Sequence, residues 1–128
     1  MAHLADINMD SVIIYHNPHC SKSRATLALL KENDAKPEII YYLEIPPSHE
    51  KLVELSEKLG IGIRELIRTS EPEYRELGLD DKSLSETTVF DIVVKHPKLI
   101  QRPIVVKGEV AILGRPPKNV LTLLESKE

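Results

Sequence analysis

The sequence predicts a protein of the α/β class in which strand, helix and strand come first, helices follow, and two strands and a helix complete the chain. Two observations support this prediction. Short β-branched runs typical of buried strands lie near both ends of the chain, at residues 12–15 and 103–106. Between them, leucines recur at helical spacing. The 128 residues, 41% of them hydrophobic, suffice for one compact core.

The first half of the predicted domain begins with the strand at 12–15, which Asn17-Pro18 brings to an end. From Ser21 onward, alanines and leucines predict a helix that ends near Asn33-Asp34. Residues 38–43 form the next predicted strand. A strand, helix and strand at this separation make a crossover, so we expect the two strands to pair in parallel.

The middle of the chain is predicted to be helical. Ser48 offers an N-cap to a helix that Gly60 terminates. Glycines and a proline break residues 61–79 into short helical pieces. Ser85 then begins another helix, which extends to His96-Pro97.

The last part of the chain predicts a hairpin and a helix. Apolar residues at 103–106 and 110–113 flank Lys107-Gly108-Glu109, a short linker typical of an antiparallel turn. A helix follows Pro116-Pro117. The complete order, β-α-β, a helical insertion and β-β-α, is that of a thioredoxin-like fold.

Domain boundaries follow from these elements. Residues 1–11 show no clear periodicity, so we interpret them as a lead-in that is disordered or only partly ordered. Residues 12–126 then form a single domain. The even spread of charge along the chain favours a monomer.

Composition excludes several classes of protein. The formal net charge is −3 and the basic residues form no dense cluster, which argues against binding nucleic acid through phosphate contacts. No apolar run approaches the roughly 20 residues that cross a bilayer, and residues 1–10 lack the pattern of a secretory signal. We therefore expect a cytoplasmic protein without a membrane segment. No metal-ligand spacing is present, so we predict no metal.

The chemistry of the chain centres on Cys20, its one cysteine, which lies between the first strand and the first helix. Free backbone N–H groups and the positive end of a helix dipole lower a thiol pKa from about 8.5 towards neutrality. The same donors can hold a tetrahedral oxyanion. Nearby positive charge comes from His16, His19, Lys22 and Arg24. The sequence therefore predicts an activated nucleophile in an anion-binding loop, rather than an inert buried thiol.

Two familiar cysteine templates do not fit. A low-molecular-weight phosphatase loop needs Cys-x5-Arg, whereas Cys20 and Arg24 form Cys-x3-Arg. A dithiol thioredoxin needs Cys-x-x-Cys, but Ser23 occupies the second thiol's position. Since a single cysteine closes no disulfide within the chain, any resolving thiol must come from another molecule.

Six further motifs stand in order along the chain. They are His16-Asn17-Pro18-x-Cys20-x-x-Ser23-Arg24, Tyr42-Leu43-Glu44-x-Pro46-Pro47, Leu66-Ile67-Arg68, Glu76-Leu77-Gly78-Leu79, His96-Pro97-x-Leu99-Ile100-x-Arg102-Pro103-Ile104 and Gly114-Arg115-Pro116. Together they resemble the motifs of the glutaredoxin-dependent arsenate reductase family, and the resemblance extends over nearly the whole predicted domain. The Cys-Ser-Lys-Ser-Arg form of the first motif is common in a chromosomal branch of that family.

The resemblance implies an oxidoreductase that needs no tightly bound cofactor. The Cys20 thiolate would attack arsenate, glutathione would join as co-substrate, and glutaredoxin would carry the electrons, leaving arsenite. His16 matches the residue that lowers the cysteine pKa in the family. Ser23 matches the residue that donates a hydrogen bond to the sulfur, and Asn17 is expected to support the loop.

The resemblance also implies how the anion is bound. Arg68, Arg102 and Arg115 correspond to the three anion-binding arginines of the family. Arginine suits this role because its planar fork meets two oxygens at once and remains charged. In thioredoxin-like folds the proline that opens the third strand is typically cis and faces the cysteine, so we expect a cis bond before Pro103.

Two alternatives remain open. A glutathione-linked thiol oxidoreductase that acts on another oxyanion or on a protein mixed disulfide would need Cys20, but a disulfide substrate would not need three converging arginines. The related Spx regulators share the fold and bind RNA polymerase, but they commonly carry Cys-x-x-Cys and lack the full arginine set.

Overall fold

The computed structural model describes residues 11–125. They fall into two compact units. We call residues 11–41 together with 102–125 the sheet unit, and residues 42–101 the helical unit. Apart from Ser11, the predicted lead-in lies outside the described residues, and the prediction of a single domain over 12–126 stays a prediction.

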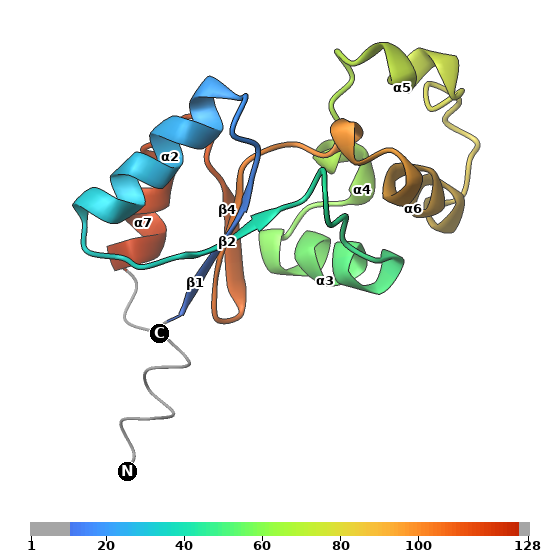
Figure 1. Cartoon of the computed structure of the whole chain (residues 1–128). Coiled ribbons are helices and arrows are strands. Elements are labelled where there is room, and N and C mark those ends of the chain that lie inside the picture. The colour runs from blue at the N-terminus through green and yellow to red at the C-terminus, as the bar shows by residue number, and fades with distance from the viewer. Residues whose placement is uncertain (1–10, 126–128) are drawn as a thin grey trace. The chain divides into compact units, whose positions relative to one another are not determined.

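The sheet unit contains a mixed sheet of four strands, β1 (Val12–His16), β2 (Glu38–Tyr41), β3 (Ile104–Lys107) and β4 (Val110–Leu113), in the order β2-β1-β3-β4 (Figure 1). The first two strands pair in parallel, as their sequence separation predicted. The last two form the expected antiparallel hairpin, and β3 also pairs antiparallel with β1. This places β1, which leads to the cysteine loop, at the centre of the sheet.

Two helices of the sheet unit, α2 (Ser21–Glu32) and α7 (Asn119–Glu125), lie together on one face of the sheet (Figure 1). Their apolar residues face the β-branched side chains of the strands. Burial of this apolar surface away from water holds the two helices against the sheet. The buried core comprises Val12, Ile14, Leu30, Val105, Val120 and Leu123. Helix α2 is thereby fixed against β1, and its N-terminus carries Cys20.

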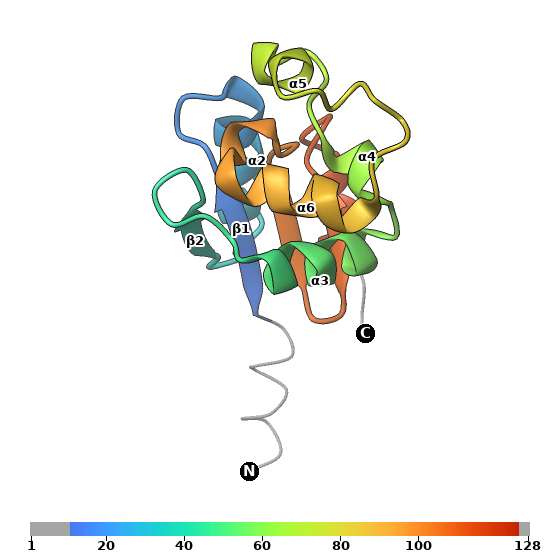
Figure 2. The same cartoon turned by 90° about the vertical axis from the view of Figure 1, so that its right-hand side faces the viewer.

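The helical unit contains α3 (His49–Leu59), α4 (Ile63–Leu66), α5 (Pro72–Glu76) and α6 (Glu86–Lys95), followed by a 3₁₀ turn, η1 (Pro97–Leu99). Helices α3 and α6 pack against each other, and α4 contacts both (Figure 2). No helix within residues 11–125 is long and apolar enough to cross a membrane.

The predicted helix ends are confirmed. The Ser48 hydroxyl accepts a hydrogen bond from the Lys51 N–H at 3.1 Å, and the Ser85 hydroxyl accepts one from the Thr88 N–H at 3.2 Å. Gly60 ends α3 in the left-handed conformation, with φ of 73°. Each cap satisfies backbone groups that the helix itself leaves without partners.

The second strand is shorter than predicted. The sequence pattern indicated residues 38–43, but β2 ends at Tyr41, and a turn begins at Tyr42. The physical reason is the parallel partner: Tyr41 pairs with His16, the last residue of β1. Beyond that point β1 offers no further backbone partner.

Candidate active site

Cys20 occupies the N-cap position of α2, in extended conformation and half-buried. Its backbone N–H donates to the Asn17 carbonyl at 3.0 Å, which closes a turn between β1 and the helix. Its carbonyl accepts the Arg24 N–H at 3.0 Å, the first hydrogen bond of the helix. The prediction that the cysteine lies at a helix start is confirmed.

The surroundings of the sulfur favour its thiolate. Burial alone would raise the pKa of Cys20, but the backbone N–H of Ser23, the side chain of Arg102 and the backbone N–H of Lys22 all contact the sulfur, and together they lower the pKa below its ordinary value. The positive charge of Arg102 acts in the same direction. The sulfur is therefore held by donors suited to a negative charge.

A buried hydrogen-bond network supports the loop between β1 and α2 that carries Cys20. The Nδ1 atom of His16 lies 2.6 Å from the Ser23 hydroxyl, which also accepts the Asn17 N–H at 3.0 Å. All three residues are buried. Burial, together with the charges of Arg24 and Lys31, lowers the pKa of His16, so its ring is neutral at neutral pH.

This network assigns the two donors of Ser23 to different partners. Its backbone N–H contacts the sulfur of Cys20, while its hydroxyl lies against His16. A neutral His16 whose Nδ1 accepts the Ser23 proton satisfies both buried side chains. The family resemblance pointed to Ser23 as a hydrogen-bond donor to the sulfur, and in this structure the backbone N–H of Ser23 lowers the thiol pKa.

Two further contacts stabilise the loop. The side-chain carbonyl of Asn17 accepts the His19 N–H at 2.9 Å, a local turn typical of asparagine. The Arg24 guanidinium donates to the Pro18 carbonyl at 2.8 Å. Lys22 is exposed. Arg24 thus braces the loop.

Two of the three predicted anion-binding arginines lie in the sheet unit with Cys20. The Arg102–Pro103 bond is cis, as the resemblance implied, and the side chain of Arg102 reaches the sulfur. The Arg115 guanidinium donates to the Arg102 carbonyl at 3.4 Å, and the bond from Arg115 to Pro116 is also cis. Arg102 and Arg115 are therefore adjacent, and both are half-buried.

The third arginine, Arg68, belongs to the helical unit. Its Nε atom forms an ion pair with the Glu71 carboxylate at 3.2 Å, and its backbone N–H donates to the Leu99 carbonyl at 2.7 Å. These contacts fix Arg68 within its own unit. Its role beside Cys20 stays a prediction.

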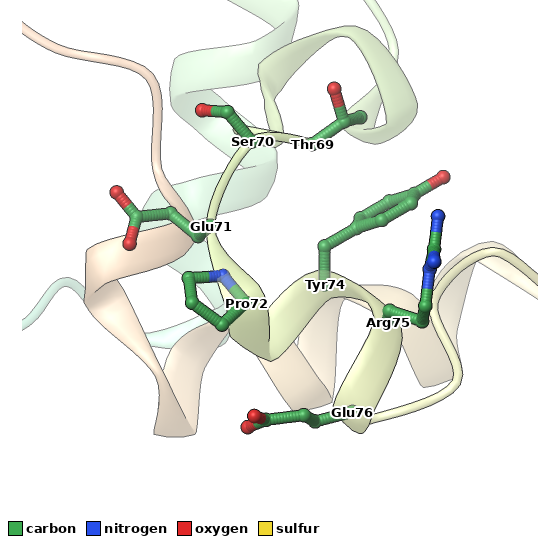
Figure 3. Close-up of a pocket in the computed structure, with 7 residues that line it drawn as sticks. All are labelled: Thr69, Ser70, Glu71, Pro72, Tyr74, Arg75 and Glu76. Atoms are coloured by element: carbon green, nitrogen blue, oxygen red, sulfur yellow. The ribbon is translucent and has the colours of Figure 1, made fainter.

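A pocket of about 670 Å³ lies in the helical unit, directly after Arg68 in the sequence (Figure 3). This pocket was not predicted, because its walls come from the short irregular segment around α5. Its lining residues are Thr69, Ser70, Glu71, Pro72, Tyr74, Arg75 and Glu76. Among residues 11–125, no three His, Cys, Asp or Glu side chains gather where they could hold a metal ion.

Sequence reasoning missed one contact near the site. Gly114 closely approaches Thr26, although 88 positions separate them. The available signal was the glycine itself, which stands between a strand and the Arg115-Pro116 pair. A glycine at a strand end often marks a close approach of two segments.

The fold and the site together define a class. A sheet of this order, with a low-pKa cysteine at the start of α2 and a cis proline before β3, is that of a thioredoxin-like protein with a single reactive thiol. The ArsC family model matches residues 15–123. The chain therefore belongs to the ArsC family.

Individual relatives agree with this assignment. The chain is 48% identical over 115 residues to a protein of Haemophilus influenzae named arsenate reductase, covering 89% of this chain and 99% of that one. It is 51% identical over 114 residues to the uncharacterized protein YfgD of Escherichia coli K12, covering 88% and 96%. A solved structure titled arsenate reductase from Vibrio cholerae has 50% identity and a TM-score of 0.87, covering 89% of this chain and 98% of that chain. These matches confirm the predicted α/β, thioredoxin-like fold and the predicted family.

Proposed function

We propose that this protein is an oxidoreductase that reduces arsenate to arsenite, with Cys20 as its nucleophile. The observation that carries the proposal is the contact of one low-pKa thiol with Arg102, beside a second arginine, Arg115. Hydrogen-bond donors alone can stabilise a thiolate. Two adjacent guanidinium groups, in contrast, suit a substrate with several negatively charged oxygens. The Haemophilus influenzae relative named arsenate reductase matches this chain over 99% of its own length.

The first step is binding and attack. Arg102 and Arg115 hold the arsenate oxygens, and the positive end of the α2 dipole adds electrostatic attraction. The Cys20 thiolate attacks arsenic, a sulfur–arsenic bond forms, and one oxygen leaves as water after taking up protons. Arsenic remains in the pentavalent state.

Reduction then requires two thiols from outside the chain. Glutathione replaces a second oxygen of the adduct, which leaves as water, so arsenic is bonded to both sulfurs. A glutaredoxin thiolate attacks the glutathione sulfur and forms a mixed disulfide. The electron pair of the broken arsenic–sulfur bond stays on arsenic, which becomes trivalent. Water then cleaves the bond to Cys20, releasing arsenite and the thiol.

The supporting residues have distinct proposed roles. His16 remains neutral and fixes the Ser23 hydroxyl, so that the Ser23 backbone N–H points at the sulfur. Asn17 and Pro103 maintain the shape of the two loops on which Cys20 and Arg102 lie. By family resemblance, Arg68 is the third arginine on the oxyanion.

The remaining parts of the proposal concern partners and setting. Glutathione is a co-substrate rather than a bound cofactor, and glutaredoxin is the protein partner. We propose that the chain acts as a cytoplasmic monomer whose residues 12–126 function as a single domain. It needs neither metal nor nucleic acid.

The test is a coupled assay of arsenate-dependent NADPH oxidation with purified protein, glutathione, glutaredoxin and glutathione reductase. Wild-type protein should consume NADPH, and Cys20→Ser should give the rate of the blank. Arg115→Ala separates arsenate from disulfide substrates: we expect arsenate turnover to fall about 100-fold, with reduction of a glutathionylated peptide unchanged. An inactive wild-type protein whose thiol still reduces that peptide would contradict the arsenate proposal.

A further inference from the structure

Three segments of the sheet unit meet at Gly114. Its N–H donates to the Pro103 carbonyl at 2.9 Å. Its own carbonyl lies 3.3 Å from the Thr26 hydroxyl, which also lies 2.8 Å from the Lys22 carbonyl and can share its proton between the two. Thr26, Pro103 and Gly114 are all buried. We call these three residues the Gly114 junction.

The junction has no room for a side chain at Gly114. A Cβ atom there would lie 2.5 Å from Thr26 Oγ1, 2.9 Å from Thr26 Cγ2 and 2.8 Å from Pro103 Cγ. Ordinary van der Waals contact begins near 3.4 Å, so a neighbouring segment would have to move by about 1 Å. The backbone of Gly114 is not among those with positive φ. The lack of room for a Cβ atom, rather than a backbone conformation that favours glycine, therefore explains why residue 114 is a glycine.

Each segment of the junction carries one residue of the candidate site. Helix α2 begins directly after Cys20, β3 follows Arg102, and β4 precedes Arg115. The bond from Arg115 to the Arg102 carbonyl is already long, at 3.4 Å. A displacement of about 1 Å would break it, because hydrogen bonds weaken steeply beyond this distance.

We propose that Thr26 and Gly114 are positioning residues, whose close contact sets the distances between the Cys20 sulfur and the guanidinium groups of Arg102 and Arg115. Neither residue touches the substrate in this proposal; both act through the segments that carry the site. The inference rests on the proposed function for its effect on arsenate, but its effect on the thiol is independent of any substrate.

The main experiment compares Gly114→Ala with Gly62→Ala. The control makes the same chemical change at a glycine whose added Cβ meets no atom within 4 Å. Alkylation of Cys20 as a function of pH measures the thiol, and steady-state kinetics give KM and kcat for arsenate. For Gly114→Ala we expect a raised thiol pKa, a raised KM and a loss in kcat/KM of about 100-fold. Gly62→Ala should match the wild type.

A second variant tests whether the clash of the added Cβ atom with Thr26 causes the effects of Gly114→Ala. Adding Thr26→Ala to Gly114→Ala removes two of the three close contacts, so it should restore part of the thiol pKa and of kcat/KM. If Gly114→Ala does not fold, Thr26→Val decides instead, since it keeps the volume and removes the hydroxyl that bonds to Gly114. A raised thiol pKa in Thr26→Val supports the proposal.

Two outcomes would overturn the proposal. One is a folded Gly114→Ala protein whose thiol pKa and arsenate KM equal those of the wild type. The other, where Gly114→Ala does not fold, is an unchanged thiol pKa in Thr26→Val. If the wild-type protein reduces no arsenate, the proposed function fails, yet the alkylation profiles still decide whether the junction positions Arg102 against Cys20.

Discussion

The sheet unit and the helical unit place their polar side chains differently. In the sheet unit, His16, Asn17, Ser23 and Thr26 are buried within a short stretch of sequence around Cys20. Of the described residues in the helical unit, Ser56 is the one buried polar residue. Helix caps and ion pairs such as Lys58–Glu54 hold most other polar groups of that unit near solvent.

The sheet unit therefore carries most of the free-energy cost of burying polar side chains. A buried polar group is expensive unless each of its hydrogen bonds is made. Around Cys20, hydrogen bonds among His16, Asn17 and Ser23 offset this cost and connect β1, the cysteine loop and α2. The polar contacts of the helical unit stabilise local structure and can be changed at lower cost.

The largest expected difference between the units comes from removing one serine hydroxyl in each. Ser23→Ala would leave the buried His16 Nδ1 and Asn17 N–H without their partner, so we expect a loss of about 2–3 kcal/mol in the free energy of unfolding. Ser56→Ala removes a hydroxyl that donates to the Val53 carbonyl in the same helix, and should cost about 1 kcal/mol or less. Urea denaturation measures both, and equal losses would contradict the distinction.

The pH dependence of stability should reveal His16. Its folded-state pKa lies below the unfolded value of about 6.5, so between these two values the unfolded chain binds the extra proton. Stability is complete above about pH 6.5 and falls as the pH is lowered towards the folded pKa, by at most about 1.4 kcal/mol per pH unit. His16→Asn should show a flatter profile. Identical profiles for the two proteins would argue against a buried neutral histidine.

A smaller effect is expected at the end of α3. Gly60 has a positive φ that an L-residue adopts with strain, and nothing crowds its Cβ position. Gly60→Ala should therefore lower the free energy of unfolding by about 1 kcal/mol through the backbone alone. Thermal denaturation measures it, and the thiol pKa of Cys20 should not move. A changed thiol pKa would mean that the helical unit affects the thiol more than we propose.

The smallest effect concerns Glu54, which pairs with Lys51 and Lys58 at 3.1 Å on the surface of α3. Hydrogen bonds from these two lysines lower the pKa of Glu54, but exposure to solvent screens the interaction. Glu54→Gln should cost about 0.5 kcal/mol or less, and the difference should shrink in high salt. A loss in the free energy of unfolding as large as that of Ser23→Ala would contradict the difference between the buried polar groups of the sheet unit and the exposed ones of the helical unit.

The sequence predicted most of the secondary structure because the local signals were strong. The β-branched run of β1, the caps Ser48 and Ser85, and Gly60 each act over a few residues, and the structure follows them. The end of β2 was misplaced because it depends on the length of its partner, β1, rather than on its own side chains.

The residues of the candidate site were predictable from the sequence, whereas the hydrogen bonds and contacts between them were less so. Cys20 at a helix start follows from the chain order, and Arg102 and Arg115 followed from the family resemblance. That Ser23 gives its hydroxyl to His16 and its amide to the sulfur depends on the geometry of the turn. The glycine at position 114 could signal a close approach, but Thr26 lies 88 positions away, so no local pattern could identify it as the partner.

The rate of alkylation of the wild-type protein as a function of pH shows directly whether Cys20 is an activated thiol. The chain has one cysteine, so the profile reports Cys20 alone. We expect a thiol pKa below the ordinary value of about 8.5, which Arg102→Ala should raise because the variant removes a donor to the sulfur and a nearby positive charge. A wild-type pKa at or above 8.5, unchanged in Arg102→Ala, would contradict the claim that α2 and Arg102 activate this thiol.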